Sequence, residues 1–277
     1  MSGALDEIAG VSPVGDPYVF GRLHPHAATL RGDVKGVLTV ARAMGKRANP
    51  KAKFLIFGRA RSGTTLLCRL LDTVPDIHCD LEVLHYRVPF PLTYLRQAMP
   101  RTAGAPIYGC KLLSYQLVEV QKIKTPESFF ARLAQDGFRF IHSTRETLTQ
   151  CMSLSIAQAT RVYLAERGGV RKDATTLDPD LFVRQVRWNE ALLRLETRLL
   201  APYDPIRVHY ETDLLDPAQH QATIDRVCKF LGTESHAVAA PMQKVLKKGF
   251  DDMVENADAV RAAVHAAGLS HVFEPGR

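Results

Sequence analysis

One stretch decides the fold class of this chain, and it reads Phe54-Leu55-Ile56-Phe57-Gly58-Arg59-Ala60-Arg61-Ser62-Gly63-Thr64-Thr65-Leu66-Leu67. It begins with a run of apolar residues that ends at Gly58, a pattern typical of a strand buried on both faces. Small, polar and basic residues follow, and from Thr64 onward the apolar residues have helical spacing. This order of strand, glycine loop and helix predicts a phosphate-binding loop, because backbone N–H groups and the positive end of the helix dipole point at the anion.

The loop departs from the common phosphate-binding pattern G-x-x-x-x-G-K-[ST] at one important position. Gly58 and Gly63 occupy the two glycine positions, but Thr64 stands where the lysine is expected. In nucleotide-hydrolysing enzymes that lysine neutralises the β- and γ-phosphates, and the hydroxyl after it holds Mg²⁺. Its absence favours a ligand with less charge at the reacting end, such as a sulfuryl group, which carries one negative charge where a terminal phosphoryl carries about two.

Length and charge narrow the class of protein. The 277 residues allow one large domain with decorations, and a hydrophobic content of 46% is enough for a sizeable core. The formal net charge of +7 and the pI of about 9.2 favour an anionic ligand or surface. The basic residues are dispersed, however, and no nucleic-acid-binding motif is present, so we expect no nucleic-acid partner.

The cysteines and the hydropathy pattern indicate a cytoplasmic protein. The five cysteines are scattered and never have C-x-x-C spacing, so we expect reduced, buried thiols and no metal site. The first residues are neither basic nor continuously apolar, which argues against a secretory signal. No apolar run approaches the ~20 residues that span a membrane, so we expect no transmembrane segment.

Strand-like and helix-like patterns alternate along the rest of the chain. Strand patterns cover residues 54–57, 106–113, 138–142 and 206–210, and helical patterns cover 34–47, 126–135, 148–166, 178–200, 216–231 and 253–266. This alternation predicts an α/β fold with a P-loop-type parallel sheet flanked by helices. We expect a single domain over residues 48–277, preceded by an irregular N-terminal arm and helix over residues 1–47.

The predicted sheet gathers several polar residues at one edge. Ligands of such sheets bind at the carboxyl ends of the strands. That rule places the loop 59–65, Lys111 and the segment 143–145 together. The short, mixed segment 77–85 follows a strand–loop–helix unit, so we expect it to bring Glu82 and His85 to the same edge.

Two motifs resemble the sulfotransferases that use 3′-phosphoadenylyl sulfate (PAPS). The family's loop R/K-S-G-T-T, which holds the 5′-phosphosulfate, matches Arg61-Ser62-Gly63-Thr64-Thr65, and Arg59 just before it is a further candidate contact. In the family a strand then leads to an arginine, with a serine eight residues later, and both bind the 3′-phosphate. Arg145 and Ser153 have that spacing here. A basic-glycine element near the end, Lys247-Lys248-Gly249, resembles a third contact to the 3′-phosphate.

The resemblance also suggests the catalytic residues. Animal cytosolic members have a lysine and a nearby histidine base after a strand, but here Lys111-Leu112-Leu113 contains no histidine. The stretch Cys79-Asp80-Leu81-Glu82 instead resembles bacterial carbohydrate sulfotransferases of the trehalose and nodulation-factor types, in which a glutamate after the first helix is the base. We therefore favour Glu82 as base over His85, with Arg61 and Lys111 stabilising the departing phosphate oxygen.

The predicted reaction is transfer of a sulfuryl group from PAPS to an acceptor hydroxyl, with adenosine 3′,5′-bisphosphate (PAP) as product and no metal. The bacterial resemblance favours an acceptor on a glycan or glycolipid, while a small alcohol, phenol or sterol stays open. We expect a small-molecule, glycan or lipid partner and allow a homodimer. Two alternatives stay open: a P-loop kinase that lacks the usual lysine, and a non-catalytic nucleotide-binding module.

Overall fold

The computed structural model describes residues 49–85, 87–121, 123–160, 174–238 and 249–274, together with Ile8, Val34, Val37, Leu38, Val40 and Ala41. The chain divides into two compact units. The larger unit comprises Pro25–Thr144 and Leu195–Pro241 and holds the sheet. The smaller unit comprises Met1–His24, Arg145–Arg194 and Met242–Arg277. Most of the predicted arm and helix at 1–47 lies outside the described residues, although the described residues from Val34 to Ala41 are helical.

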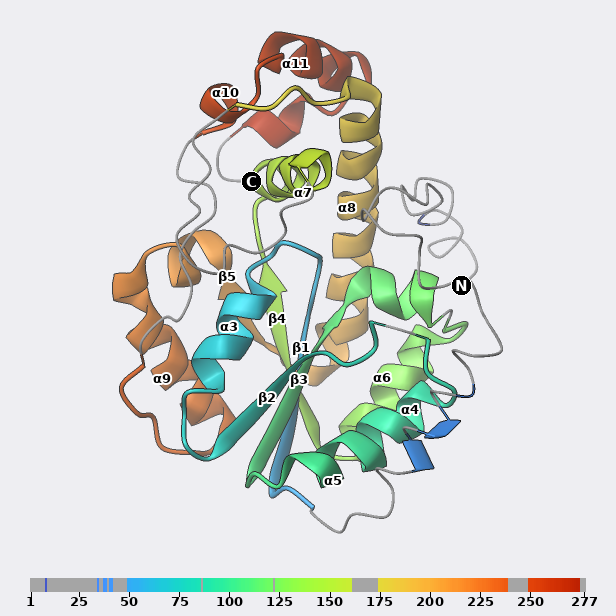
Figure 1. Ribbon diagram of the computed structural model, residues 1–277, viewed down its shortest axis with the longest axis vertical. Coiled ribbons are helices and arrows are strands. Elements are labelled where there is room, and N and C mark those ends of the chain that lie inside the picture. Colours follow the sequence, from blue (N-terminus) through green and yellow to red (C-terminus); the bar gives the residue numbers. More distant parts are fainter. Residues whose placement is uncertain are drawn as a thin grey trace. The chain divides into compact units, whose positions relative to one another are not determined.

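A five-stranded sheet forms the centre of the larger unit (Figure 1), with the strand order β2-β3-β1-β4-β5. All its strand pairs are parallel, which confirms the predicted fold class. The strands are β1 Ala52–Gly58, β2 Ile77–Glu82, β3 Ile107–Leu113, β4 Phe138–Thr144 and β5 Ile206–His209. The edge strand β2 lies within the segment 77–85, whose mixed sequence did not indicate a strand. Buried and half-buried residues alternate along the first half of β2.

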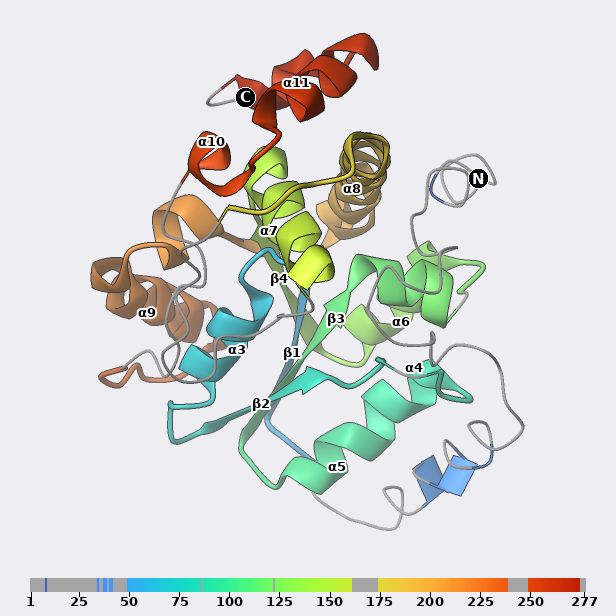
Figure 2. The ribbon, with the colours of Figure 1, turned by 45° about the horizontal axis from the view of Figure 1, so that its top comes forward.

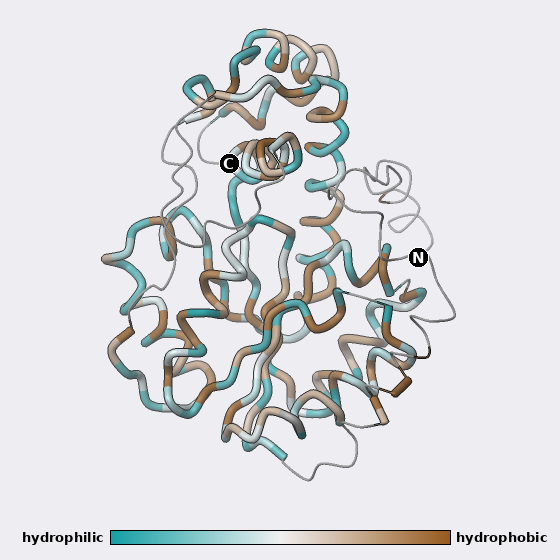
Figure 3. Tube along the Cα trace, viewed as in Figure 1, coloured by the Kyte–Doolittle hydropathy of each residue, from teal (hydrophilic) through white to brown (hydrophobic). Residues whose placement is uncertain are grey.

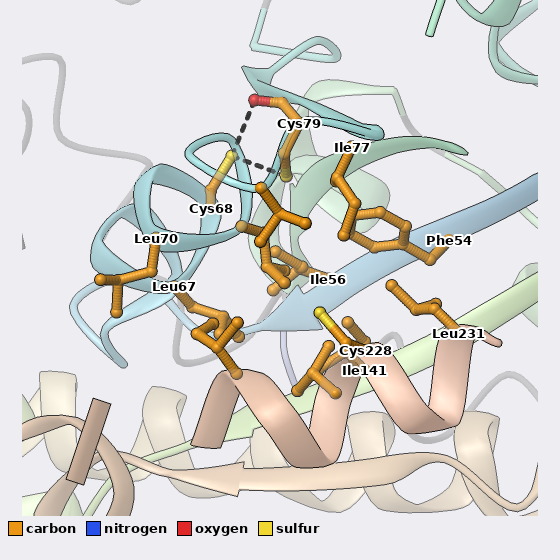
Figure 4. Close-up of a cluster of buried hydrophobic side chains, with 14 of the residues drawn as sticks. Phe54, Ile56, Leu67, Cys68, Leu70, Ile77, Cys79, Ile141, Cys228 and Leu231 are labelled. Atoms are coloured by element: carbon orange, nitrogen blue, oxygen red, sulfur yellow. Dashed lines mark hydrogen bonds between the residues drawn. The ribbon is translucent and has the colours of Figure 1, made fainter. Parts of the chain in front are cut away.

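Strand β1 has apolar side chains on both faces because successive side chains of a strand point to opposite sides. Phe54 and Ile56 pack into a core formed with α3 (Thr64–Leu71) and α9 (His220–Leu231), as Figure 4 shows. On the other face, Phe57 meets Phe130 of α6 (Pro126–Gln135) with ring centroids 4.8 Å apart. Two layers of helices therefore bury the central strand.

Shorter elements complete the larger unit. They are α4 Pro91–Thr93, η2 Tyr94–Ala98, α5 Met99–Ala103, η3 Gln116–Val120, η4 Ala201–Tyr203, η5 Tyr210–Leu214 and η6 Pro217–Gln219. Figure 2 shows α3 and α9 on one side of the sheet and α4, α5 and α6 on the other. Hydrophobic and hydrophilic residues alternate along these covering helices (Figure 3), as expected of helices that have one face in the core and the other in solvent.

The smaller unit has a core of its own. Helices α7 (Thr147–Thr160), α10 (Phe250–Met253) and α11 (Ala257–Ala266) contribute to it, as does α8 (Pro179–Leu200) up to Arg194. A parallel bridge joins Thr175 to Val254. The residues of the predicted 148–166 helix beyond Thr160 lie outside the described residues. As predicted, all five cysteines of the chain are buried and without a disulfide.

Candidate active site at the carboxyl edge of the sheet

The glycine loop joins β1 to α3 with a strained backbone. Arg61 has a φ of 68° and Gly63 a φ of 86°, both in the left-handed region. For a residue other than glycine that conformation costs of order 1–3 kcal/mol and persists only where the surroundings enforce it. A loop of this kind turns N–H groups toward one point and forms an anion-binding concavity. The two left-handed residues are compatible with such a concavity, and anion binding by this loop stays a prediction.

Both glycines of the loop are required by close packing. A Cβ atom at Gly58 would lie 2.3 Å from the carbonyl oxygen of Ser143, and one at Gly63 would lie 2.7 Å from the Tyr210 ring. The Ser143 hydroxyl also donates a 2.8 Å hydrogen bond to the Ser62 carbonyl oxygen. Ser143 at the end of β4 and Tyr210 at the start of η5 thus pack closely against the loop.

A buried cluster of Arg59, Glu196 and His142 lies behind the loop. The side chain of Arg59 has no exposed surface, and its Nε lies 4.0 Å from Oε2 of Glu196, which is equally buried. His142 Nε2 lies 3.2 Å from the same carboxylate oxygen. The Ser62 hydroxyl donates to the Arg59 carbonyl oxygen at 2.7 Å. The side chains of Arg59 and Ser62, which we predicted to contact the ligand, are therefore directed into the protein, and the backbone N–H of Ser62 also donates to the Arg59 carbonyl oxygen, at 3.4 Å.

Lys111 links the loop to Glu82. It lies in β3, and its side chain is only 4% exposed. Its Nζ donates to Thr65 Oγ1 at 2.6 Å and lies 2.9 Å from Glu82 Oε1. Three predicted site residues from three different elements are thus in direct contact.

A β-bulge aligns Glu82 with Lys111. Asp80 pairs with Cys110, but the next pair in the register is Glu82 with Lys111, so Leu81 has no partner of its own. Since the side chains of a strand alternate between its faces, a register change of one residue reverses the face that a side chain occupies. Bulges are frequent beside active sites, where they redirect a side chain.

The carboxylate of Glu82 is held ionised. Its Oε2 lies 3.4 Å from His85 Nδ1 and accepts a 2.6 Å hydrogen bond from Gln116 Nε2. Burial alone would raise the pKa of Glu82, but the hydrogen bond from His85 and the charge and hydrogen bond of Lys111 outweigh it and lower the pKa to about 2. The side chain is still 29% exposed, so a ligand can reach it.

Gln116 is a site residue that our sequence analysis missed. It is fully buried, and its Oε1 accepts a 3.1 Å hydrogen bond from the backbone N–H of Leu113. One signal was present in the sequence, because Gln116 is a polar residue in an apolar stretch shortly after the carboxyl end of a predicted strand. Glu196 and His142 were missed as well, since both lie inside regular elements where polar residues are commonly solvated.

The residues predicted to bind the 3′-phosphate belong to the smaller unit. Arg145 precedes α7, and its Nε donates to Thr149 Oγ1 at 3.1 Å. Ser153 lies within α7 and is buried. Gly249 has an extended backbone at the start of α10, while Lys247 and Lys248 lie outside the described residues. This second phosphate site stays a prediction.

The described part of the chain contains no group of three or more His, Cys, Asp or Glu side chains that is placed to hold a metal ion. None of its helices combines the length and apolar character needed to cross a bilayer.

Comparisons with known proteins gave matches among solved structures only. No protein-family model matches the sequence, and neither does any curated protein. One of the matching structures is described as a sulfotransferase from Alicyclobacillus acidocaldarius. It is 17% identical, the match covers 79% of this chain and 97% of that chain, and the TM-score is 0.45. A likeness at this level does not decide function, which has to come from the residues of the site.

Proposed function

We propose that this chain is a sulfotransferase that moves a sulfuryl group from PAPS to an acceptor hydroxyl. The observation that carries the proposal is the position of Lys111, which contacts both Thr65 of the anion-binding loop and the carboxylate of Glu82. A transfer reaction needs these parts together: a cradle for the anion, a cation for the charge that develops, and a base for the incoming hydroxyl.

Each group has a defined task in this reaction. The loop N–H groups and Arg61 hold the phosphosulfate, while Arg145, Ser153 and the segment 247–249 hold the 3′-phosphate. The acceptor oxygen forms a bond to sulfur as the bond from sulfur to the phosphate oxygen breaks, and the electron pair of that bond leaves on the phosphate, giving PAP. Lys111 and Arg61 stabilise this charge. The proton of the acceptor hydroxyl passes to Glu82.

The low pKa of Glu82 shapes the mechanism. A carboxylate with a pKa of about 2 is a weak base toward an alcohol. We propose that Lys111 moves from Glu82 to the phosphate oxygen as charge develops there, so that Glu82 becomes more basic when the proton has to move. His85 is the second candidate for the base, because its imidazole lies 3.4 Å from Glu82 and histidine is the side chain that most often acts as a general base.

For the acceptor we propose a hydroxyl of a glycan or glycolipid. Phe90 lies eight residues beyond Glu82, is 72% exposed and has a φ of 59°. An exposed aromatic ring held by a strained backbone suits stacking on an apolar sugar face. We place the reaction in the cytoplasm, where five buried thiols stay reduced.

Calorimetric titration with PAP and with ATP plus Mg²⁺ tests the donor. We expect PAP to bind and Arg145→Ala to weaken its binding by about 1.5–3 kcal/mol, the value of a hydrogen bond to a charged group. Tight binding of ATP with Mg²⁺ and none of PAP would favour the kinase alternative and refute the proposal.

Mass spectrometry of glycan and lipid extracts incubated with PAPS and the protein tests the reaction. We expect sulfated products that are absent when the protein carries Glu82→Gln. A variant Glu82→Gln with full activity would transfer the role of base to His85, and His85→Asn then becomes the variant that abolishes turnover. If PAP binds and no acceptor is ever sulfated, the protein is a nucleotide-binding module.

A further inference from the structure

The segment after β3 contains a π-helical turn. In η3 the backbone N–H of Gln121 donates to the carbonyl oxygen of Gln116 at 2.8 Å, five residues back in the chain. Turns of this kind are rare in proteins and are frequently found at functional sites. Residues five apart on an α-helix point about 140° away from each other. A π turn has more residues per turn, so Gln116 and Gln121 come to the same side.

Gln116 contacts Glu82 in only one possible orientation. The N–H of Leu113 donates to Oε1 of Gln116, so the other end of the amide must be the NH₂ group. That group lies 2.6 Å from Oε2 of Glu82 and donates to it. Oε2 is therefore an acceptor in this arrangement.

Gln121 contacts the chain just after Glu82. Its Nε2 donates to the carbonyl oxygen of Leu84 at 2.9 Å, and its Oε1 accepts from the backbone N–H of Val88 at 3.1 Å. Its side chain is buried, as is that of Gln116. One amide side chain thus links the backbone of Leu84 to that of Val88.

We propose that Gln116 and Gln121 form a brace, in which Gln116 is a positioning residue for the Glu82 carboxylate and Gln121 fixes the following segment 84–88. The brace holds Oε2 of Glu82 at one point while Oε1 stays with Lys111. It also orients the backbone that carries His85. The catalytic consequence rests on the proposed function, but the brace itself is a property of the contacts.

A titration of Glu82 tests the role of Gln116 without any assay of activity. The protein is labelled with ¹³C at the glutamate carboxyl groups, and Glu82→Gln identifies the resonance of Glu82. In Gln116→Met the side chain keeps its length and loses its donor, so we expect the pKa of Glu82 to rise by about one to two units. The other side chains at this carboxylate, Lys111 and His85, are unchanged in the variant.

A second variant keeps the test decisive if Gln116→Met folds poorly. Gln116→Glu retains an oxygen for the Leu113 N–H and replaces the donor to Glu82 by a second carboxylate. We expect the pair to share one proton and to titrate in two steps, one of them well above the ordinary range. As a control, Gln135→Met on the exposed end of α6 should leave the pKa of Glu82 unchanged. An unchanged Glu82 pKa in both Gln116 variants would overturn the proposal.

Hydrogen exchange tests the role of Gln121. In Gln121→Met the N–H of Val88 loses its acceptor, and we expect its exchange to accelerate by about tenfold or more relative to the α6 amides, since a local opening replaces a protected state. The pKa of Glu82 should move little in this variant. Unchanged protection of Val88 would show that Gln121 does not hold the segment.

Kinetics connect the brace to the proposed reaction. In Gln116→Met we expect kcat to fall by about tenfold to a hundredfold with an unchanged KM for the donor, because the base is misplaced and the cradle is intact. The acid limb of the pH–rate profile should move up with the Glu82 pKa measured by NMR. A fall in kcat without that movement would contradict a positioning role. If PAP fails to bind the parent protein, the proposed function fails while the NMR and exchange results still decide the brace.

Discussion

Lys111 and Glu82 form an ion pair of 2.9 Å in which the lysine is 4% exposed and the carboxylate 29%. The buried member of the pair belongs to an inner strand and the accessible one to an edge strand. Because water reaches only the carboxylate, the ammonium depends on its protein partners for solvation. Loss of either protein partner would therefore leave the ammonium with little solvation, which costs free energy for a buried charge.

Removal of the Lys111 charge should weaken the contacts of Glu82 and lower the stability of the fold. We expect Lys111→Met to lower the unfolding free energy by about 1–3 kcal/mol, since Glu82 and Thr65 each lose a hydrogen-bond partner. Urea denaturation measures this effect. A double-mutant cycle with Glu82→Gln should show coupling between the two sites, whereas Lys51→Met, at an exposed position before β1, should show none. Additive effects of the first pair would mean that the contact is unimportant for stability.

Stability should depend on pH through Glu82. Its folded pKa of about 2 lies below the ordinary value of 4.5, so its stabilising contribution is present above pH 4.5 and disappears as the pH falls toward 2. We therefore expect the difference in unfolding free energy between the parent and Glu82→Gln to be constant at higher pH and to shrink within that window. Denaturation curves at a series of pH values measure it. A difference that persists unchanged to pH 2 would be inconsistent with an ionised, paired carboxylate.

Two glycines with similar backbones should respond differently to alanine. Gly63 and Gly137 have φ values of 86° and 79°. A Cβ at Gly63 meets Tyr210 at 2.7 Å, while one at Gly137 meets nothing within 4 Å. Gly137→Ala should thus cost only the backbone strain of about 1–2 kcal/mol. Gly63→Ala should cost more in thermal or urea denaturation and should also reduce anion binding. Equal losses in the two variants would argue against the close packing of the loop.

The buried cluster below the loop should contribute more than a surface ion pair. Glu196→Leu leaves the guanidinium of Arg59 without its buried partner carboxylate, and we expect a loss of about 3–5 kcal/mol in unfolding free energy. A matched control is Glu127→Leu, whose partner Arg198 lies 3.4 Å away with both side chains nearly half exposed. We expect at most about 1 kcal/mol there. A small effect at Glu196 would show that the loop does not depend on this cluster.

The thiols should be unreactive in the folded protein. All five cysteines are buried, and burial, followed by the hydrogen bond with Cys68, raises the pKa of the Cys79 thiol well above its usual value. Cys68 and Cys79 lie side by side with their sulfur atoms 2.8 Å apart (Figure 4). We expect a colourless reaction mixture with a disulfide reagent under native conditions and full colour in guanidinium chloride. Rapid native labelling would indicate that the core around α3 opens easily.

Local patterns were enough to predict the centre of the fold. The apolar run of β1, the glycine loop and the start of α3 are adjacent in the chain, so their structure depends on neighbouring residues. The parallel arrangement then brought Lys111 and Glu82 to the same edge, because the carboxyl ends of parallel strands coincide. This much of the candidate site follows from the sequence.

Long-range partners account for what was missed. The inward direction of Arg59 depends on Glu196, which is far along the chain and shows no pattern that relates the two. The alignment of Glu82 with Lys111 depends on a bulge at Leu81, and an irregular register leaves no period in the sequence. Gln116 acts through a π turn, whose five-residue spacing resembles neither a helix nor a strand pattern.

The strand order has a consequence for the newly made chain. β1 and β2 follow each other in sequence but are not neighbours, and Ala52 pairs with Ile107 while Lys53 pairs with Phe138. During synthesis the apolar run of β1 therefore leaves the ribosome with both edges unpaired until β3 and then β4 have been made. Exposed apolar strands of this kind attract chaperones and one another. Ser143, which packs against Gly58 and donates to Ser62, belongs to β4, so a chain stalled before β4 carries the loop motif without these contacts.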